Sequence, residues 1–321
     1  MGPNMRRREF ITLLGGVAVW PRAARAQQAK MPRIGVLLVA GSEVLGPFQQ
    51  ALRDLGYIEG KTIQIDIRSA EGRANLLPEL AAELVRSKVD VIVASQTPAI
   101  MAAKNATRDI PIVMAPAGDP LALGFIASLA RPGGNITGLS AANDELAAKS
   151  LELIREILPT ARRVGVLGNA SDPFVKSFLE HIQQAAPTVR LEVQPIMIRG
   201  DDELEGAFAA MARERSDAVV VQSSLPVNLT VDLALKYRLP SLSAQTSDAH
   251  AGRLATYSAS FVERSRQIAG YVDNILKGAE PSDLPVQQPT KFELVINLKT
   301  AKAIGIAIST SPLARADEVI E

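Results

Sequence analysis

The sequence predicts an α/β protein of two lobes, each a parallel β-sheet covered by helices, joined by a hinge of several strands. Short apolar runs alternate with longer stretches of mixed polarity, which is typical of strands and helices in βαβ units. The series also recurs at an offset that stays between 127 and 130 residues, as three pairs of expected strands show: 33–38 and 163–168, 90–96 and 217–223, and 110–115 and 239–244. A duplicated unit therefore accounts for both lobes.

The remaining elements of each unit fall between these strands. Apolar runs such as 33–38 are typical of strands buried on both faces, because right-handed crossovers place helices on both sides of a parallel sheet. The second strand of each unit, by contrast, alternates apolar and polar residues. The expected helices and second strands are 45–55, 63–67 and 76–86 in the first unit, and 174–184, 191–194 and 204–213 in the second.

The segments outside the duplicated units are expected to link the lobes. Residues 131–135 indicate a turn and 136–140 a strand crossing between the lobes, while a helix at 145–158 opens the second unit. Later elements are a strand at 254–257, a helix at 261–276, a connector at 281–289, a strand at 292–296 and a helix at 299–304. The predicted lobes are 32–137 with about 258–287, and 138–257 with about 288–321. Several crossings form a hinge that can close over a ligand.

The first 26 residues have the pattern of a cleaved export signal. Arg6, Arg7 and Arg8 precede a mostly apolar run at 11–20, and Ala24-Arg25-Ala26 provides the small residues of a cleavage site. Ten residues span about 15 Å as a helix, which is about half a bilayer core, so a permanent anchor is not expected. The arginine pair followed by Glu9, Phe10 and Ile11 is similar to the twin-arginine export motif, with general secretion as the alternative route. We expect cleavage near Ala26 and a periplasmic protein.

Composition excludes several classes of function. The chain has 35 Lys+Arg against 34 Asp+Glu, and losing the signal removes five Arg and one Glu, so the mature protein is mildly acidic. A nucleic-acid-binding protein would normally carry a basic surface. The absence of Cys excludes disulfides, thiolate nucleophiles and iron–sulfur sites. Two His without Cys make a poor metal set, so neither a metal nor a cofactor is predicted.

The candidate binding site lies in the loops that follow the strands. In open parallel sheets, ligands bind beyond the carboxyl ends of the strands, near helix N-termini whose free N–H groups favour a carboxylate. These loops carry hydroxyls, amides and small residues, which suit a small polar ligand. The ligand-binding residues predicted there are Ser42, Ser95, Gln96, Thr97, Gly118, Asp119, Asn169, Gln222, Ser223 and Gln245, with Tyr257 available for stacking on an aromatic ligand.

Signs of catalysis are weak. Thr97, Asp119, Asp172 and Asp248 each fit as ordinary helix caps. His181 falls in a helical run and is expected at a solvated position, and His250 falls in a loop. No nucleophile motif of the G-x-S-x-G type is present. The chain is therefore not predicted to be an enzyme, and no catalytic residue is assigned.

Several longer motifs resemble one known family. The segment that starts at Gly118-Asp119-Pro120 and runs through Arg131-Pro132-Gly133-Gly134-Asn135 resembles the signature of the ABC transporter substrate-binding proteins typified by tryptophan- and tyrosine-binding members. Further similarity covers 149–154, 288–301 and 313–321, so it spans essentially the whole mature chain. A departure occurs after Tyr257, where Ser258 replaces the commoner glycine.

The resemblance implies two Rossmann-like lobes in the type I periplasmic binding protein fold. It also implies delivery of a small solute to an ABC permease and its ATPase at the inner membrane, and binding through the loops after Gln96, Asp119, Asn169 and Gln222 and near Tyr257. The expected ligand is a small organic molecule such as an aromatic or amino-acid-like carboxylate, and a monomer is expected.

Two alternatives remain open from the sequence. A sensory module that presents its ligand to a chemoreceptor or kinase would share the fold and the pocket. A two-lobed α/β enzyme would need an acid and a base facing each other across the cleft, for which the available pairs are Asp119 with Asp172 or Asp248.

Overall fold

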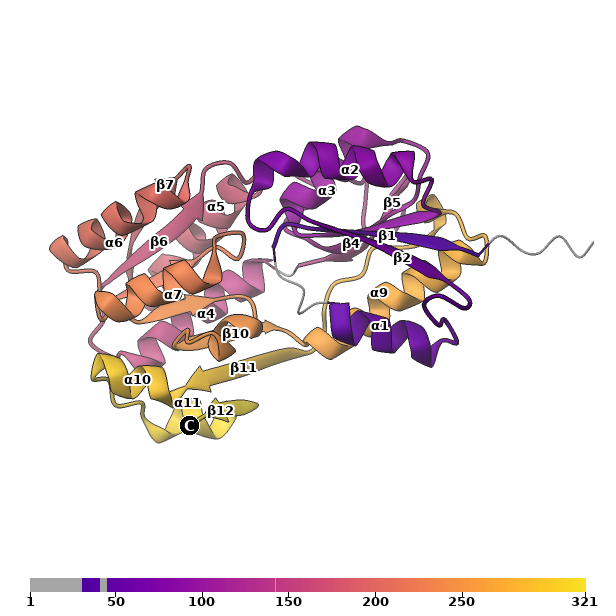
Figure 1. Ribbon diagram of the computed structural model, residues 1–321. Helices are drawn as coiled ribbons and strands as arrows, with labels where there is room; N and C mark the ends of the chain where they lie inside the picture. Colours follow the sequence, from indigo (N-terminus) through magenta and orange to yellow (C-terminus); the bar gives the residue numbers. More distant parts are fainter. Residues whose placement is uncertain (1–30, 41–44, 142) are drawn as a thin grey trace, which may run out of the picture. The chain divides into compact units, whose positions relative to one another are not determined.

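The structure is a computed structural model that describes residues 31–40, 45–141 and 143–321 (Figure 1). The predicted export signal and Ser42 lie outside the described residues. From Pro32 to Glu321 the chain forms one compact unit, which contains two β-sheets.

The first sheet has five parallel strands in the order β2-β1-β3-β4-β5. Helices α2 and α3 cover one face and α1 and α9 cover the other (Figure 1). The strands are β1 (Arg33–Leu38), β2 (Gln64–Ser69), β3 (Val91–Ser95), β4 (Ile112–Ala117) and β5 (Ile136–Ser140). The helices are α1 (Leu45–Asp54), α2 (Leu77–Arg86), α3 (Thr97–Ala106) and α9 (Phe261–Leu276), with short 3-10 turns η1 (Ala74–Leu76) and η4 (Pro281–Asp283).

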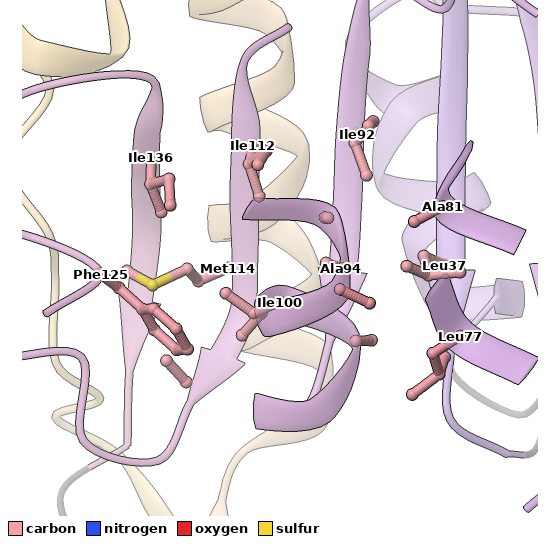
Figure 2. Close-up of a cluster of buried hydrophobic side chains, with 14 of the residues drawn as sticks. Leu37, Leu77, Ala81, Ile92, Ala94, Ile100, Ile112, Met114, Phe125 and Ile136 are labelled. Atoms are coloured by element: carbon pink, nitrogen blue, oxygen red, sulfur yellow. The ribbon is translucent and has the colours of Figure 1, made fainter. Parts of the chain in front are cut away.

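Both faces of this sheet are apolar because alternate side chains of each strand point to opposite sides. Ile92 and Ala94 of β3 pack beneath α2 and α3, and Figure 2 shows Ala94 beside Ile100 of α3. Val91 and Val93 belong to the opposite cluster with α1 and α9. The continuous apolar runs predicted this double burial, as expected for a parallel sheet.

The second sheet has seven strands in the order β12-β11-β10-β9-β8-β6-β7, and β10 with β11 is its antiparallel pair. Helices α4 and α5 pack on one face and α6 and α7 on the other. The strands are β6 (Arg163–Asn169), β7 (Glu192–Ile198), β8 (Ala218–Val221), β9 (Ser241–Ser243), β10 (Ala255–Ala259), β11 (Phe292–Asn297) and β12 (Glu318–Ile320). The helices are α4 (Asn143–Ile157), α5 (Val175–Ala185), α6 (Leu204–Arg213), α7 (Val227–Lys236), α8 (Ser247–His250), α10 (Leu298–Ile304) and α11 (Thr310–Arg315), with 3-10 turns η2 (Ala186–Val189) and η3 (Asp201–Glu203).

The duplication extends to individual hydrogen bonds. The order β2-β1-β3-β4-β5 is matched by β7-β6-β8-β9-β10. Asp90 accepts a hydrogen bond from the backbone N of Arg33 at 2.7 Å, and Asp217 does the same for Arg163 at 2.9 Å. Each arginine also donates from Nη1 to the C-cap carbonyl of α2 or α6, at 2.7 and 2.6 Å. The predicted repeat therefore describes a shared set of tertiary contacts as well as a shared strand order.

The segment 136–140 was expected to cross between the lobes, but it is the fifth strand of the first sheet. Gly138 allows this close pairing, because its φ is 122° and an added Cβ would lie 2.5 Å from the backbone N of Met114 on β4. All five residues of β5 are buried. The predicted lobe boundary at 137/138 cuts this strand, and we propose a boundary after Ser140 instead.

Three segments connect the sheets: β5 to α4, β10 to α9, and η4 to β11. The last one pairs with the end of β5, where Ser140 N donates to Gln287 O at 2.9 Å and Gln287 N donates to Gly138 O at 3.1 Å. Helix α9 thus returns to the first sheet after β10, before β11 rejoins the second.

Candidate functional site

A cavity lies between loops of the two sheets. Its lining includes Gln96, Thr97 and Gly118, which follow β3 and β4 of the first sheet. Its other side includes residues that follow β6, β8 and β9 of the second sheet. The volume open to the centres of water-sized spheres is about 140 Å³, close to that of apolar cavities of ~150 Å³ that hold benzene. The cavity therefore has room for a small ring.

The structure brings together six of the predicted binding residues and leaves four outside the cavity. The six are Gln96, Thr97, Gly118, Gln222, Ser223 and Gln245. The side chains outside are Ser95, Asp119, Asn169 and Tyr257. Asp119 accepts a hydrogen bond from Ala122 N at 3.1 Å. This bond lies within a turn between β4 and β5, where the described residues form no helix, so the expected helix-cap role was wrong. Tyr257 stacks on Phe292 of the neighbouring strand, with ring centroids 5.4 Å apart, so its ring already has an aromatic partner.

The side chain of Gln96 connects the two sides of the cavity, and its backbone is strained. Its φ of 70° and ψ of 157° lie in a region used mainly by glycine, at a cost of about 1–3 kcal/mol. The side-chain Nε2 donates to Ser223 O at 3.2 Å and to Gln245 Oε1 at 3.5 Å, both in loops of the second sheet. Strain of this kind tends to persist at functional sites because the surrounding structure imposes it.

Gly118 lets an aromatic ring of the second side approach the first. A Cβ added at Gly118 would lie 2.4 Å from Cγ of Phe174, so no other residue fits here without a shift. The loop is fixed by Thr97, whose Oγ1 accepts a hydrogen bond from Gly118 N at 3.0 Å. Thr97 and Gly118 therefore shape the cavity wall through backbone placement.

Gln222 lines the cavity, but both ends of its amide are engaged by its own side of the cavity. Its Oε1 accepts a hydrogen bond from Asn169 N at 2.8 Å, and its Nε2 donates to Asp172 Oδ2 at 2.8 Å. Asp172 was expected as a helix cap, or as part of an acid–base pair in the enzyme alternative, and its Oδ1 accepts a hydrogen bond from Phe174 N at 2.9 Å. Asp172 also lines the cavity while only 4% exposed. Burial raises its pKa, and the nearby Ser224 hydroxyl and Phe174 N–H oppose that rise only in part.

Arg264, in the first turn of α9, is a cavity residue that the sequence analysis missed. Its Nε is buried and has no hydrogen-bond partner within the described part of the chain. Burial lowers its pKa to about 10, although Glu293 favours the charged form, so the guanidinium is charged at neutral pH. The segment was predicted as a helix, yet only the return of α9 to the first sheet brings this arginine to the cavity.

The rest of the lining is mainly apolar, and one part of it comes from α4, α5 and the residue before α5. The ring centroids of Phe174 and Phe178 lie 6.2 Å apart, and the angle between the ring planes is 56°. Ile182 and Leu146 line the same cavity. His181 lines the cavity as well, so the expectation of a solvated position was wrong. The spacing 174, 178, 181, 182 is one face of a helix, a signal in the sequence that would have identified this wall.

Within residues 31–40, 45–141 and 143–321, three or more His, Asp or Glu side chains nowhere come together in a group that could hold a metal ion. None of the helices that the structure describes is long and apolar enough to cross a membrane.

Comparison with known proteins identifies the family. The model of the ABC transporter substrate binding protein family matches residues 40–320. The chain belongs to this family. A tyrosine-binding protein of Clostridioides difficile (strain R20291) is 31% identical over 81% of this chain and 75% of its own length.

Two solved structures have the same fold. A conserved domain protein from Vibrio cholerae superposes with a TM-score of 0.83 at 29% identity, over 90% of this chain and 100% of that one. An ABC domain in complex with L-Trp from Streptococcus pneumonia gives 0.82 at 27% identity, over 90% and 99% of the two chains. The predicted type I periplasmic binding protein fold is confirmed, as is the role of solute-binding component of an ABC import system. The sensory and enzymatic alternatives are not favoured, since the family is one of binding proteins.

Proposed function

We propose that this ABC substrate-binding protein captures a small aromatic carboxylate of the amino-acid type. The observation that carries the proposal is the Arg264 guanidinium, whose Nε is buried without a partner among the described residues, in a cavity with an aromatic wall. A carboxylate would satisfy the guanidinium through charge-assisted hydrogen bonds. The ligand's ring would pack against Phe174 and Phe178.

The relatives support the aromatic part of the proposal. The Clostridioides difficile relative is named for tyrosine, and the Streptococcus structure holds L-Trp. The cavity volume of about 140 Å³ fits one ring and its substituent. Binding without chemistry is sufficient for this role, so we assign no catalytic residue and no cofactor.

Calorimetry of the mature protein with phenylalanine, tyrosine, tryptophan, leucine and glucose tests the proposal. We expect heat from at least one aromatic amino acid and little from leucine or glucose. Arg264→Gln should weaken that binding by at least about tenfold, because it removes charged hydrogen bonds worth ~1.5–3 kcal/mol each. Arg266→Gln is the matched control, since Arg266 lies on the same helix with its side chain 65% exposed.

Equal affinities in the two variants would contradict the proposal, as would binding of glucose or leucine alone. Trp20, the only Trp, precedes the predicted cleavage site. Indole fluorescence on adding tryptophan to the mature protein therefore comes from the ligand alone, which gives a rapid first screen.

We also propose that the chain is exported, cleaved near Ala26 and active as a monomer in the periplasm, where it delivers its ligand to an ABC permease and ATPase. The basic segment, apolar run and small-residue site before residue 27 support this. Mass spectrometry of the protein recovered from the periplasm should show an N-terminus near residue 27. Arg7→Lys with Arg8→Lys should abolish export if the twin-arginine route is used, whereas unchanged export would indicate general secretion.

A further inference from the structure

We infer that Asp172 binds the ammonium group of the ligand, so that the cavity selects α-amino acids over the same aromatic acids without the amine. The inference rests on the proposed function and names the group that defines the ligand class. Gln222 is the positioning residue for the Asp172 carboxylate.

Uncharged donors surround the Asp172 carboxylate. The carboxylate accepts hydrogen bonds from Phe174 N and Gln222 Nε2, both uncharged donors. Within the described ranges, no Lys, Arg or His side chain forms an ion pair with it. A buried carboxylate without a counter-charge is unfavourable, and the raised pKa of Asp172 expresses that cost.

Arg264 carries the opposite charge and lines the same cavity, but it does not pair with Asp172. Arg264 lies on α9 of the first sheet, whereas Asp172 precedes α5 of the second. No ion pair joins them in the part of the chain that the structure describes. A ligand carrying both a carboxylate and an ammonium group would satisfy the two charges at once. An aromatic acid without the amine would satisfy only Arg264.

A third observation is a hydroxyl beside Asp172. The Ser224 Oγ is buried and lines the cavity, and it lies close enough to the Asp172 carboxylate to lower its pKa. An ammonium group has three N–H donors and needs several acceptors. Asp172 with Ser224 supplies oxygens of the kind that such a group requires.

Gln222 fixes the direction of the carboxylate. Its amide is held at one end by Asn169 N and bonds Asp172 Oδ2 at the other, each at 2.8 Å. The side chain is only 3% exposed, so it has little freedom to rotate. Removing the amide would leave Asp172 present but free to turn away from the ligand.

The test compares matched pairs of ligands by calorimetry. The pairs are phenylalanine with 3-phenylpropionate, tyrosine with 3-(4-hydroxyphenyl)propionate, and tryptophan with indole-3-propionate. The wild-type protein should bind the amino acid of at least one pair about tenfold or more tightly than its partner acid. Asp172→Asn should abolish that preference by weakening the amino acid, with the acid unchanged or improved. Asp119→Asn, in the loop after β4 of the first sheet and outside the cavity, should keep the preference.

Gln222→Met tests the positioning role, because it keeps the side-chain length and removes the amide. It should reduce the ratio of the two affinities while changing the affinity for the acid little. A purely structural role would weaken both ligands in equal proportion.

The outcomes separate this inference from the proposed function. If the wild-type protein binds both members of a pair equally and Arg264→Gln weakens both, the proposed function stands and the role of Asp172 is wrong. An Asp172→Asn variant that loses both ligands equally also overturns the inference. If no pair binds to the wild-type protein, both proposals fail. The comparison on the wild-type protein needs no variant, so it remains decisive should Asp172→Asn fold poorly.

Discussion

Gly118 and Phe174 show how one missing side chain shapes the cavity. The Phe174 ring occupies the space that a Cβ on Gly118 would need, at 2.4 Å from Cγ. Phe174 follows β6 of the second sheet, while Gly118 follows β4 of the first. The contact therefore sets how closely these two loops approach each other.

Gly118→Ala should lower the free energy of unfolding by about 1–3 kcal/mol, the usual cost of overpacking. It should also weaken ligand binding, because the displaced ring belongs to the cavity wall. Urea denaturation and calorimetry measure the two effects. Gly206→Ala is the control, since no atom lies within 4 Å of the added Cβ and Ala favours the helix by about 0.5–1 kcal/mol.

The double variant Gly118→Ala with Phe174→Leu distinguishes the cause. The cost of the pair should be clearly less than the sum of the two single costs, because the smaller side chain relieves the overlap. Additive costs would show that the glycine is needed for some reason other than the ring.

The sequence predicted which loops surround the cavity more accurately than it predicted which groups their side chains contact. Gln96 and Gln222 were both expected to contact ligand, since long amides at strand ends need partners. The structure shows that Gln222 finds its partners in Asn169 and Asp172. Arg264 lies 168 residues from Gln96 in the chain, and local patterns carry no information on such pairings. Ligand contact itself remains a prediction for all of these residues.

At the scale of elements, the strand–helix units are held by matched acidic residues. Asp90 and Asp217 precede β3 and β8, and each accepts a backbone N–H from the start of the neighbouring strand, β1 or β6. Removing such an acceptor lowers the free energy of unfolding by more than an average hydrogen bond contributes, because the donor N–H is left unsatisfied. The same hydrogen bond therefore links the first and third strands of both duplicated units.

Asp90→Ala and Asp217→Ala should each lower the free energy of unfolding by about 1–3 kcal/mol. Because the sites lie in different sheets, the double variant should cost close to the sum. Asp109→Ala, at an exposed loop position, should change stability little. Denaturation in urea checks the series, and a large effect at one aspartate with none at the other would contradict the shared role.

The strands and helices of the duplicated units follow from local periodicity, and the structure confirms the α/β class with two sheets. The place of β5 in the first sheet did not follow in the same way. Residues 136–140 have an apolar pattern that fits a strand in either sheet, and pairing with β4 depends on Gly138. Which sheet a strand joins is a non-local property.

For the molecule as a whole, the side chain of Gln96 links loops of the two sheets while its backbone carries strain. Binding proteins of this type bind between lobes that move on a hinge, and a ligand favours the conformation that it binds better. In this structure the hydrogen bonds of Gln96 join loops of the two sheets.

Gln96→Gly should separate the effect of the backbone strain from the effect of the side-chain hydrogen bonds. Glycine relieves the positive φ, so stability should be unchanged or raised by about 1 kcal/mol. Ligand affinity should fall several-fold, because the bonds to Ser223 and Gln245 are lost. Lys88→Gly is the matched control, since Lys88 also has a positive φ, of 54°, but lies outside the cavity. Unchanged affinity in Gln96→Gly would show that the contact has no part in binding.

The three connections between the sheets also set the order in which the protein can mature during synthesis. One core of the first sheet includes Ile268, Val272 and Ile275 of α9, and a core of the second includes Leu294 and Ile296 of β11. Chains emerge from the ribosome N-terminus first, so neither core is complete until most of the polypeptide has been translated. The last quarter of the chain therefore supplies the final elements of both cores, first α9 for the first sheet and then β11 for the second.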